Sequence, residues 1–190
     1  MTWLLRKVDD LDPWLKLVDE EDLSATIENP PLWAIRLFIP SVKDRGSLSL
    51  YEVQDEPAAK PVAAAWGFIL GDIAKSTTPV SFIAVERSKL EAAGFVIEDS
   101  PGGLHHETDN LHRGISPANL EEAKKLAGLF IDGELFRFEG KTVQLAAKEE
   151  ARLERFKFVP IAKLGPDHRA AKNVLKLVCE EVVAVRGTAA

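Results

Sequence analysis

Val80-Ser81-Phe82-Ile83-Ala84-Val85 is the stretch that decides the fold of this chain. Branched and aromatic side chains in a nearly continuous apolar run after Pro79 predict a buried β-strand. A helix is expected before this strand, opened by Pro61 and ended near Gly71, whose missing β-carbon suits a closing position. A second, short helix is expected after it, over residues 86–93. Helices on both sides of a strand in the sequence predict a domain in which helices cover a sheet.

Apolar runs and turn residues predict the remaining elements. Further strands are expected over residues 2–8, 33–39, 47–53, 95–97, 135–138 and 142–145. Those over 33–39 and 47–53 are expected to pair antiparallel, and the last two to form a hairpin. Helices are expected to start at Asp12-Pro13 and Ser116-Pro117 and to cover residues 146–156 and 166–185.

These elements predict a single α+β, or mixed α/β, domain with a mixed β-sheet of about five to seven strands flanked by helices. Residues 1–145 are expected to form this core domain. Residues 146–190 are expected to form a C-terminal helical extension that packs on the core or on a partner.

Composition narrows the classes of function. The chain has 190 residues, 46% of them hydrophobic, and a net charge of −6 that is spread along the sequence. This balance works against nucleic-acid binding, which needs clustered Lys and Arg. Cys179 is the only cysteine, which excludes an internal disulfide and a thiolate metal cluster. The sequence contains no apolar run of the roughly 20 residues that cross a bilayer and no secretory signal, so a cytoplasmic protein without a membrane segment is expected.

The stretch Leu104-His105-His106-Glu107-Thr108-Asp109-Asn110-Leu111-His112-Arg113 holds three of the four histidines. The turn signal Pro101-Gly102-Gly103 before it and Gly114 after it predict a loop. His105, His106 and Asp109, with His112 beside them, are candidate ligands of zinc, manganese or iron. A helical metal pair would need the spacing of His105 and Asp109 on a helix, which these glycines argue against. A polar surface or interface loop is therefore the favoured interpretation, and no cofactor can be named.

An acid–base site is a second interpretation of the same stretch. His112 would transfer a proton and Arg113 would hold an anionic group. The chain contains no nucleophile elbow, phosphate-cradling Gly-rich loop or dinucleotide fingerprint that would support it. Arg113 could equally pair with a nearby carboxylate as part of the fold.

The order of several motifs resembles a group of small uncharacterised bacterial cytoplasmic proteins. In that group a Leu-Ser-x-x-x-Val strand precedes an Ala-rich helix, and a Pro-Gly loop leads to an Asn-x-x-His segment and a long helix. The matching motifs here are Leu48-Ser49-Leu50-Tyr51-Glu52-Val53, the strand over 80–85, Pro101-Gly102 and Asn110-Leu111-His112-Arg113. The resemblance covers about residues 30 to 130. It implies a bacterial cytoplasmic protein without a stated activity, and it marks Asn110, His112 and Arg113 as the positions of interest, Asn110 for binding.

The absent catalytic motifs lead us to expect a non-enzymatic accessory or regulatory protein that acts through protein–protein interaction. A bacterial multi-gene system, such as phage defence or toxin–antitoxin control, is the expected setting. The C-terminal helix is the expected surface for a protein partner or for self-association, because it carries an apolar stripe of Ala171, Val174, Leu175, Val178, Val182 and Val185. The alternative is a small metal-dependent or acid–base hydrolase that uses the stretch from His105 to Arg113.

Overall fold

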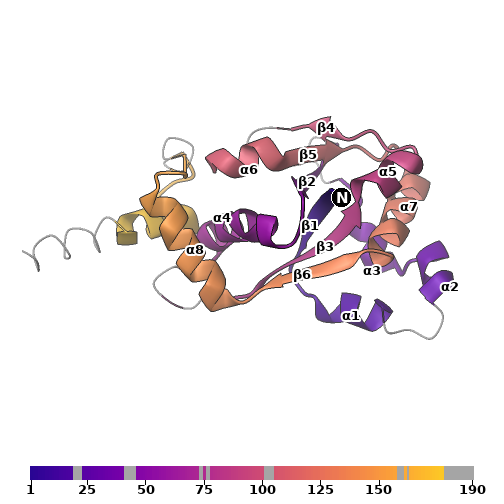
Figure 1. Ribbon diagram of the computed structural model, residues 1–190, viewed down its shortest axis with the longest axis horizontal. Helices are drawn as coiled ribbons and strands as arrows, with labels where there is room; N and C mark the ends of the chain where they lie inside the picture. The colour runs from indigo at the N-terminus through magenta and orange to yellow at the C-terminus, as the bar shows by residue number, and fades with distance from the viewer. Residues whose placement is uncertain are drawn as a thin grey trace, which may run out of the picture. The chain divides into compact units, whose positions relative to one another are not determined.

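A computed structural model describes residues 1–18, 23–40, 46–72, 75, 78–100, 105–157, 161 and 163–177. These residues contain a six-stranded antiparallel sheet with the strand order β4-β5-β2-β1-β3-β6, together with a series of helices (Figure 1). This arrangement confirms the α+β class and the number of strands. The sheet is antiparallel, whereas strands in both orientations had been expected.

The strands confirm most of the expected positions. They are β1 (Trp3–Val8), β2 (Leu48–Val53), β3 (Val80–Glu86), β4 (Glu98–Asp99), β5 (His112–Ile115) and β6 (Glu134–Phe138). The helices are α1 (Asp12–Val18), α2 (Leu23–Glu28), α3 (Leu32–Arg36), α4 (Lys60–Leu70), α5 (Arg87–Ala92), α6 (His106–Leu111), α7 (Leu120–Ile131) and α8 (Gly140–Arg152), with a 3₁₀ turn η2 at Pro57–Ala59. Residues 169–177 are also helical.

The chain divides into two compact units that interleave along the sequence. Unit 1 comprises residues 1–58, 81–101 and 111–137, and unit 2 comprises residues 59–80, 102–110 and 138–190. Each unit is therefore built from segments that are far apart in the sequence. The division into residues 1–145 and 146–190 stays a prediction.

Unit 1 is a sheet with helices packed on one face. Alternate residues of the strands, among them Leu4, Leu50 and Ile83, point to the same face and enter one buried cluster with residues of α1, α3 and α7. The period of two in a strand explains why the intervening residues lie on the opposite face. Helix α7 contacts α1, α2, α3 and α5, so it is the central helix of this layer (Figure 1).

Unit 2 is built around the contact between α4 and α8. The end of α4 is held by Asn173, whose side-chain amide donates to the backbone oxygens of Phe68, at 2.6 Å, and Gly71, at 3.0 Å. Carbonyl groups at the end of a helix lack partners within the helix, and this buried amide supplies one. Asn173 thus fixes the helical residues 169–177 to α4.

Two expected strands are helices. Residues 33–39 were expected to form a strand, but Leu32–Arg36 is α3, with Ala34, Ile35 and the following Phe38 buried at helical spacing. Residues 142–145 were expected to close a hairpin, but they belong to α8, which buries Val143, Ala146 and Ala147. A short apolar run fits either period, so burial against neighbouring elements decides between them.

Smaller differences concern the ends of elements. The strand expected at residues 95–97 is displaced to Glu98–Asp99. Helix α7 starts three residues after Ser116-Pro117, because Asn119 is its N-cap and accepts a hydrogen bond from the amide of Glu122 at 2.9 Å. Of the C-terminal apolar stripe, Val178, Val182 and Val185 lie outside the described residues.

The close contact between α4 and α8 gives a prediction for Gly67. A Cβ at this position would lie 2.1 Å from Cγ1 of Val143, a stiff side chain in a helix. Gly67→Ala is therefore expected to lower the free energy of unfolding by about 1–3 kcal/mol. This loss outweighs the gain of about 0.5–1 kcal/mol that alanine normally brings inside a helix. Urea titration measures the difference.

The matched test of this clash uses Val143→Ala as the background. Once Cγ1 is removed, the same Gly67→Ala change is expected to stabilise the protein, because only the helix propensity of alanine remains. A change of equal size and sign in both backgrounds would contradict the contact between these two residues.

Candidate functional site

The histidine stretch is not a loop. His106–Leu111 forms α6 and His112–Ile115 forms β5, so the expectation of an irregular segment was wrong. The stretch is also divided between the units after Asn110. The turn signal Pro101-Gly102-Gly103 on which the expectation depended lies outside the described residues.

His105 is the N-cap of α6 and is fully buried. Its Nδ1 accepts a hydrogen bond from the amide of Thr108, at 3.3 Å, and its Nε2 lies 3.0 Å from Oε2 of Glu150 in α8. Because Nδ1 accepts from an N–H group, the ring proton lies on Nε2 and is donated to the carboxylate. This residue therefore joins the start of α6 to α8.

Arg155 and Phe156 complete the surroundings of His105 within unit 2. The Nη1 atom of Arg155 lies 3.1 Å from Oε1 of Glu150 and 2.9 Å from Oε1 of Glu107. The ring of Phe156 meets His105 edge to face at a centroid distance of 4.8 Å. Burial lowers the pKa of His105 below 6.5, although the carboxylates of Glu150 and Glu107 act in the opposite direction. The geometry describes a structural residue that links the elements of unit 2.

The other candidates on α6 do not gather around His105. His106 and Asn110 have exposed side chains, and Asp109 forms an ion pair with Lys157. No group of three or more His, Cys, Asp and Glu side chains within the described part of the chain could hold a metal ion. The assignment of His105, His106 and Asp109 as metal ligands stays a prediction.

His112 and Arg113 belong to unit 1. Nδ1 of His112 forms a hydrogen bond with the backbone oxygen of Ser100, and its ring lies edge to face against Tyr51 at a centroid distance of 5.2 Å. A carbonyl can only accept, so Nδ1 carries the proton and Nε2 is the basic nitrogen of the neutral ring. This is an oriented imidazole on the surface of the sheet.

Arg113 forms part of an ion-pair network on the sheet. Its Nε lies 2.5 Å from Oε2 of Glu52, whose other oxygen lies 2.8 Å from Nη1 of Arg87. Burial raises the pKa of Glu52, but hydrogen bonds from the two guanidinium groups outweigh this effect and lower the pKa below 4.5. The interpretation of Arg113 as a partner of a nearby carboxylate agrees with this geometry.

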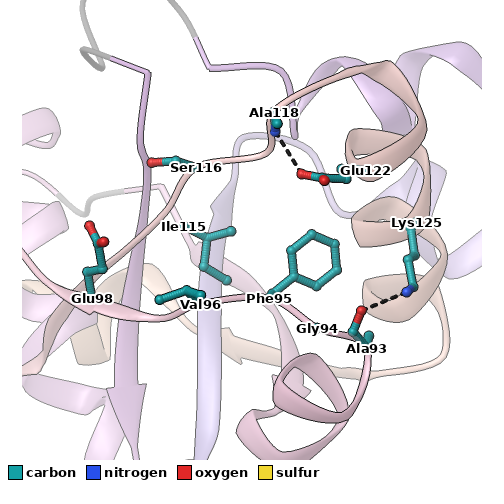
Figure 2. Close-up of a pocket in the computed structure, with 10 residues that line it drawn as sticks. All are labelled: Ala93, Gly94, Phe95, Val96, Glu98, Ile115, Ser116, Ala118, Glu122 and Lys125. Atoms are coloured by element: carbon teal, nitrogen blue, oxygen red, sulfur yellow. Dashed lines mark hydrogen bonds between the residues drawn. The ribbon is translucent and has the colours of Figure 1, made fainter.

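A cleft in unit 1 was not anticipated from the sequence. It has a volume of about 400 Å³ and lies between the segment that follows α5 and the first half of α7 (Figure 2). Phe95 and Ile115 supply apolar surface, and the charged groups in its lining are Glu98, Glu122 and Lys125. Glu122 accepts from the amide of Ala118 at 2.7 Å, and Lys125 donates to the oxygen of Ala93 at 2.7 Å.

A second, smaller cleft of about 240 Å³ shares Ala118 with the first. Its lining includes Ile39 and Leu120, which are 46% and 57% exposed. Val96, in the lining of the larger cleft, is 72% exposed. Ile39 and Leu120 therefore present apolar side chains to solvent at the start of α7, and Val96 presents another at the larger cleft. The sequence indicated this apolar surface only through the run Phe95-Val96-Ile97, which was interpreted as a strand.

Comparison with known protein families, curated proteins and solved structures finds no match to the chain. Within the described ranges, every helix is too short or too polar to span a lipid bilayer.

Proposed function

We propose that this chain is a non-enzymatic accessory protein whose larger cleft in unit 1 binds a segment of a partner protein. The observation that carries the proposal is the cleft itself, in which Phe95 and Ile115 supply apolar surface and Val96 is largely exposed. Covering the exposed Val96 with an apolar side chain of a partner lowers the free energy, because it removes apolar surface from water.

The volume of the cleft suits the anchoring side chain of a protein segment. Clefts of about 300–1,000 Å³ accommodate ligands the size of a few side chains. The cleft of about 400 Å³ stands at the small end of this range. One or two apolar side chains inserted above Phe95 and Ile115 would fill it, as anchor residues do at protein interfaces.

Charge indicates the chemistry of the partner segment. The lining holds two carboxylates, Glu98 and Glu122, and one ammonium group, Lys125. Lys125 and Glu122 both have backbone partners, the oxygen of Ala93 and the amide of Ala118. The chain as a whole carries a net charge of −6. A segment with an apolar anchor next to Lys or Arg is complementary to this surface, and the smaller cleft would take a second apolar side chain.

The C-terminal helix contributes less to this proposal than the sequence suggested. Ala171, Val174 and Leu177 pack against the buried cluster of unit 2 itself, whereas Leu175 is 62% exposed. Self-association through this helix, and the setting in a bacterial multi-gene system, stay predictions.

Peptides selected from a phage-displayed library of random dodecapeptides test the proposal. We expect the selected peptides to combine aliphatic or aromatic residues with Lys or Arg. Val96→Ser is expected to weaken their binding about tenfold, because it removes exposed apolar area that the partner segment would cover. Glu98→Lys is expected to weaken it by a similar factor through charge reversal. Fluorescence anisotropy of the labelled peptides measures both.

Two exposed residues of unit 2 provide matched controls. Leu175→Ser replaces an exposed aliphatic side chain by serine and Glu149→Lys reverses an exposed charge, both on helical positions, and both are expected to leave the affinity unchanged. Equal binding by the Val96→Ser protein, or no enrichment of any peptide sequence, would refute binding at this cleft.

The second candidate function is acid–base hydrolysis at His112. The observation in its favour is the orientation of the ring by Ser100 and Tyr51, which leaves Nε2 as a base. Hydrolysis of p-nitrophenyl esters that is lost in His112→Ala but retained in His106→Ala would favour this candidate over the binding protein.

A further inference from the structure

The ring of His105 makes two hydrogen bonds at once, and the one that it accepts requires the ring to be neutral. As the N-cap of α6, it supplies Nδ1 as the acceptor for the amide of Thr108, the third residue of the helix. This amide is one of the donors that a helix leaves without a partner at its N-terminus. From its other nitrogen the ring donates to Glu150.

A second proton on this ring must go to Nδ1, because Nε2 already carries one. The new N–H group would face the amide of Thr108 at 3.3 Å, so two donors would oppose each other and the cap would be lost. The carboxylates of Glu150 and Glu107 do not relieve this conflict, because Glu150 is bonded to the opposite nitrogen and both pair with Arg155.

The segment held by His105 extends beyond α6. The amide of His106 donates to the oxygen of Arg155 at 2.8 Å, and His105 forms an isolated β-bridge with Phe156. The ring of Phe156 in turn stacks on Phe68 of α4, at a centroid distance of 3.9 Å. The loss of the cap would therefore loosen α6 and residues 153–157 together.

We propose that His105 is a proton-controlled cap, which fixes α6 and residues 153–157 to α8 at neutral pH and releases them in acid. The charged groups that face its ring are Glu150 of α8, Glu107 of α6 and Arg155 of the 153–157 segment. Helix α4 contacts this group through Phe68, whose ring stacks on that of Phe156. The Asp109–Lys157 ion pair also joins α6 to residues 153–157.

The direction of the pH dependence follows from the lowered pKa of His105. When α6 and residues 153–157 are released, the pKa of His105 has its ordinary value of 6.5, so acid favours this open state. The stabilisation is complete above pH 6.5 and is lost as the pH falls from 6.5 toward the lower pKa of the closed state. The pKa of the Glu52 carboxyl in unit 1 is lowered below its ordinary value of 4.5, so its own acid response belongs to a lower pH range.

Amide hydrogen exchange of the full chain between pH 7.5 and 4.5 tests this cap. After correction for intrinsic exchange, the protection of the Thr108 amide is expected to fall by up to about tenfold per pH unit below 6.5. In His105→Asn the dependence is expected to vanish, because asparagine caps helices well and does not titrate. His106→Asn, which changes the exposed neighbour, is expected to retain the wild-type slope.

The proposal would be overturned if the protection of the Thr108 amide did not change with pH in the wild type. It would also be overturned if this protection fell with pH in His105→Asn as it does in the wild type. If the His105→Asn protein does not fold, the ring of His105 in the wild type is titrated by NMR instead. A pKa below 6.5 together with the neutral tautomer that is protonated on Nε2 supports the cap. A pKa at or above 6.5 contradicts it.

Discussion

Phe130→Ala is expected to lower the free energy of unfolding of unit 1 by about 3–5 kcal/mol, the usual cost of deleting a buried aromatic ring. Phe130 lies on α7 and is 1% exposed, and its ring meets that of Phe38 at a centroid distance of 4.9 Å. The cavity would open in the cluster that joins α7 to the sheet, and that cluster cannot collapse without moving a helix. Urea titration followed by tryptophan fluorescence measures the loss, because Trp14 belongs to the same cluster.

Leu120→Ala on the same helix is the matched control. Leu120 is more than half exposed, so its removal is expected to change the free energy of unfolding by less than about 0.5 kcal/mol. Similar losses in the two variants would show that α7 does not pack as described.

Gly133→Ala is expected to cost about 3 kcal/mol, because two backbone oxygens occupy the space that a methyl group needs. A Cβ at Gly133 would lie 2.0 Å from the oxygen of Ala84 in β3 and 3.0 Å from that of Phe130. Backbone atoms cannot rotate away as a side chain can, so the start of β6 would have to move from its neighbour in the sheet. Thermal unfolding is expected to show a lower midpoint than in the wild type.

Gly94→Ala separates this collision from the conformational cost of replacing glycine. Gly94 has φ of +91°, but a Cβ there would meet no atom within 4 Å. Its replacement is expected to cost only about 1–2 kcal/mol, the strain of a left-handed backbone. An equal or larger loss at Gly94 would contradict the close approach of Gly133 to β3.

The apolar patterns of the sequence predicted the elements whose burial is uniform. The strand over 80–85 is buried from Val80 to Val85, and the helix opened by Pro61 buries most of one face of α4. The patterns failed where a few apolar residues fit either period. The segments of α3 and α8 are helices and not strands because α3 packs against α7 and α8 packs against α4. These partners lie far away in the sequence.

The candidate site was predicted as a list of residues and not as an arrangement. His112 and Arg113 were identified as residues of interest, but their partners Ser100, Tyr51 and Glu52 are brought to them by strand pairing. The role of His105 was missed for the same reason, since Glu150 lies 45 residues away in the sequence. Only packing shows that this ring caps a helix.

Local chemistry, from the run at 80–85 to the single cysteine, was enough to predict an α+β or mixed α/β domain and to exclude an internal disulfide. Strand order, the burial of His105 and the cleft at Val96 were decided by contacts between distant segments. The physical reason is that the period of apolar residues records which face of an element is buried, whereas it carries no information about which other element buries it. Cavities and buried polar pairs arise only where two such faces meet.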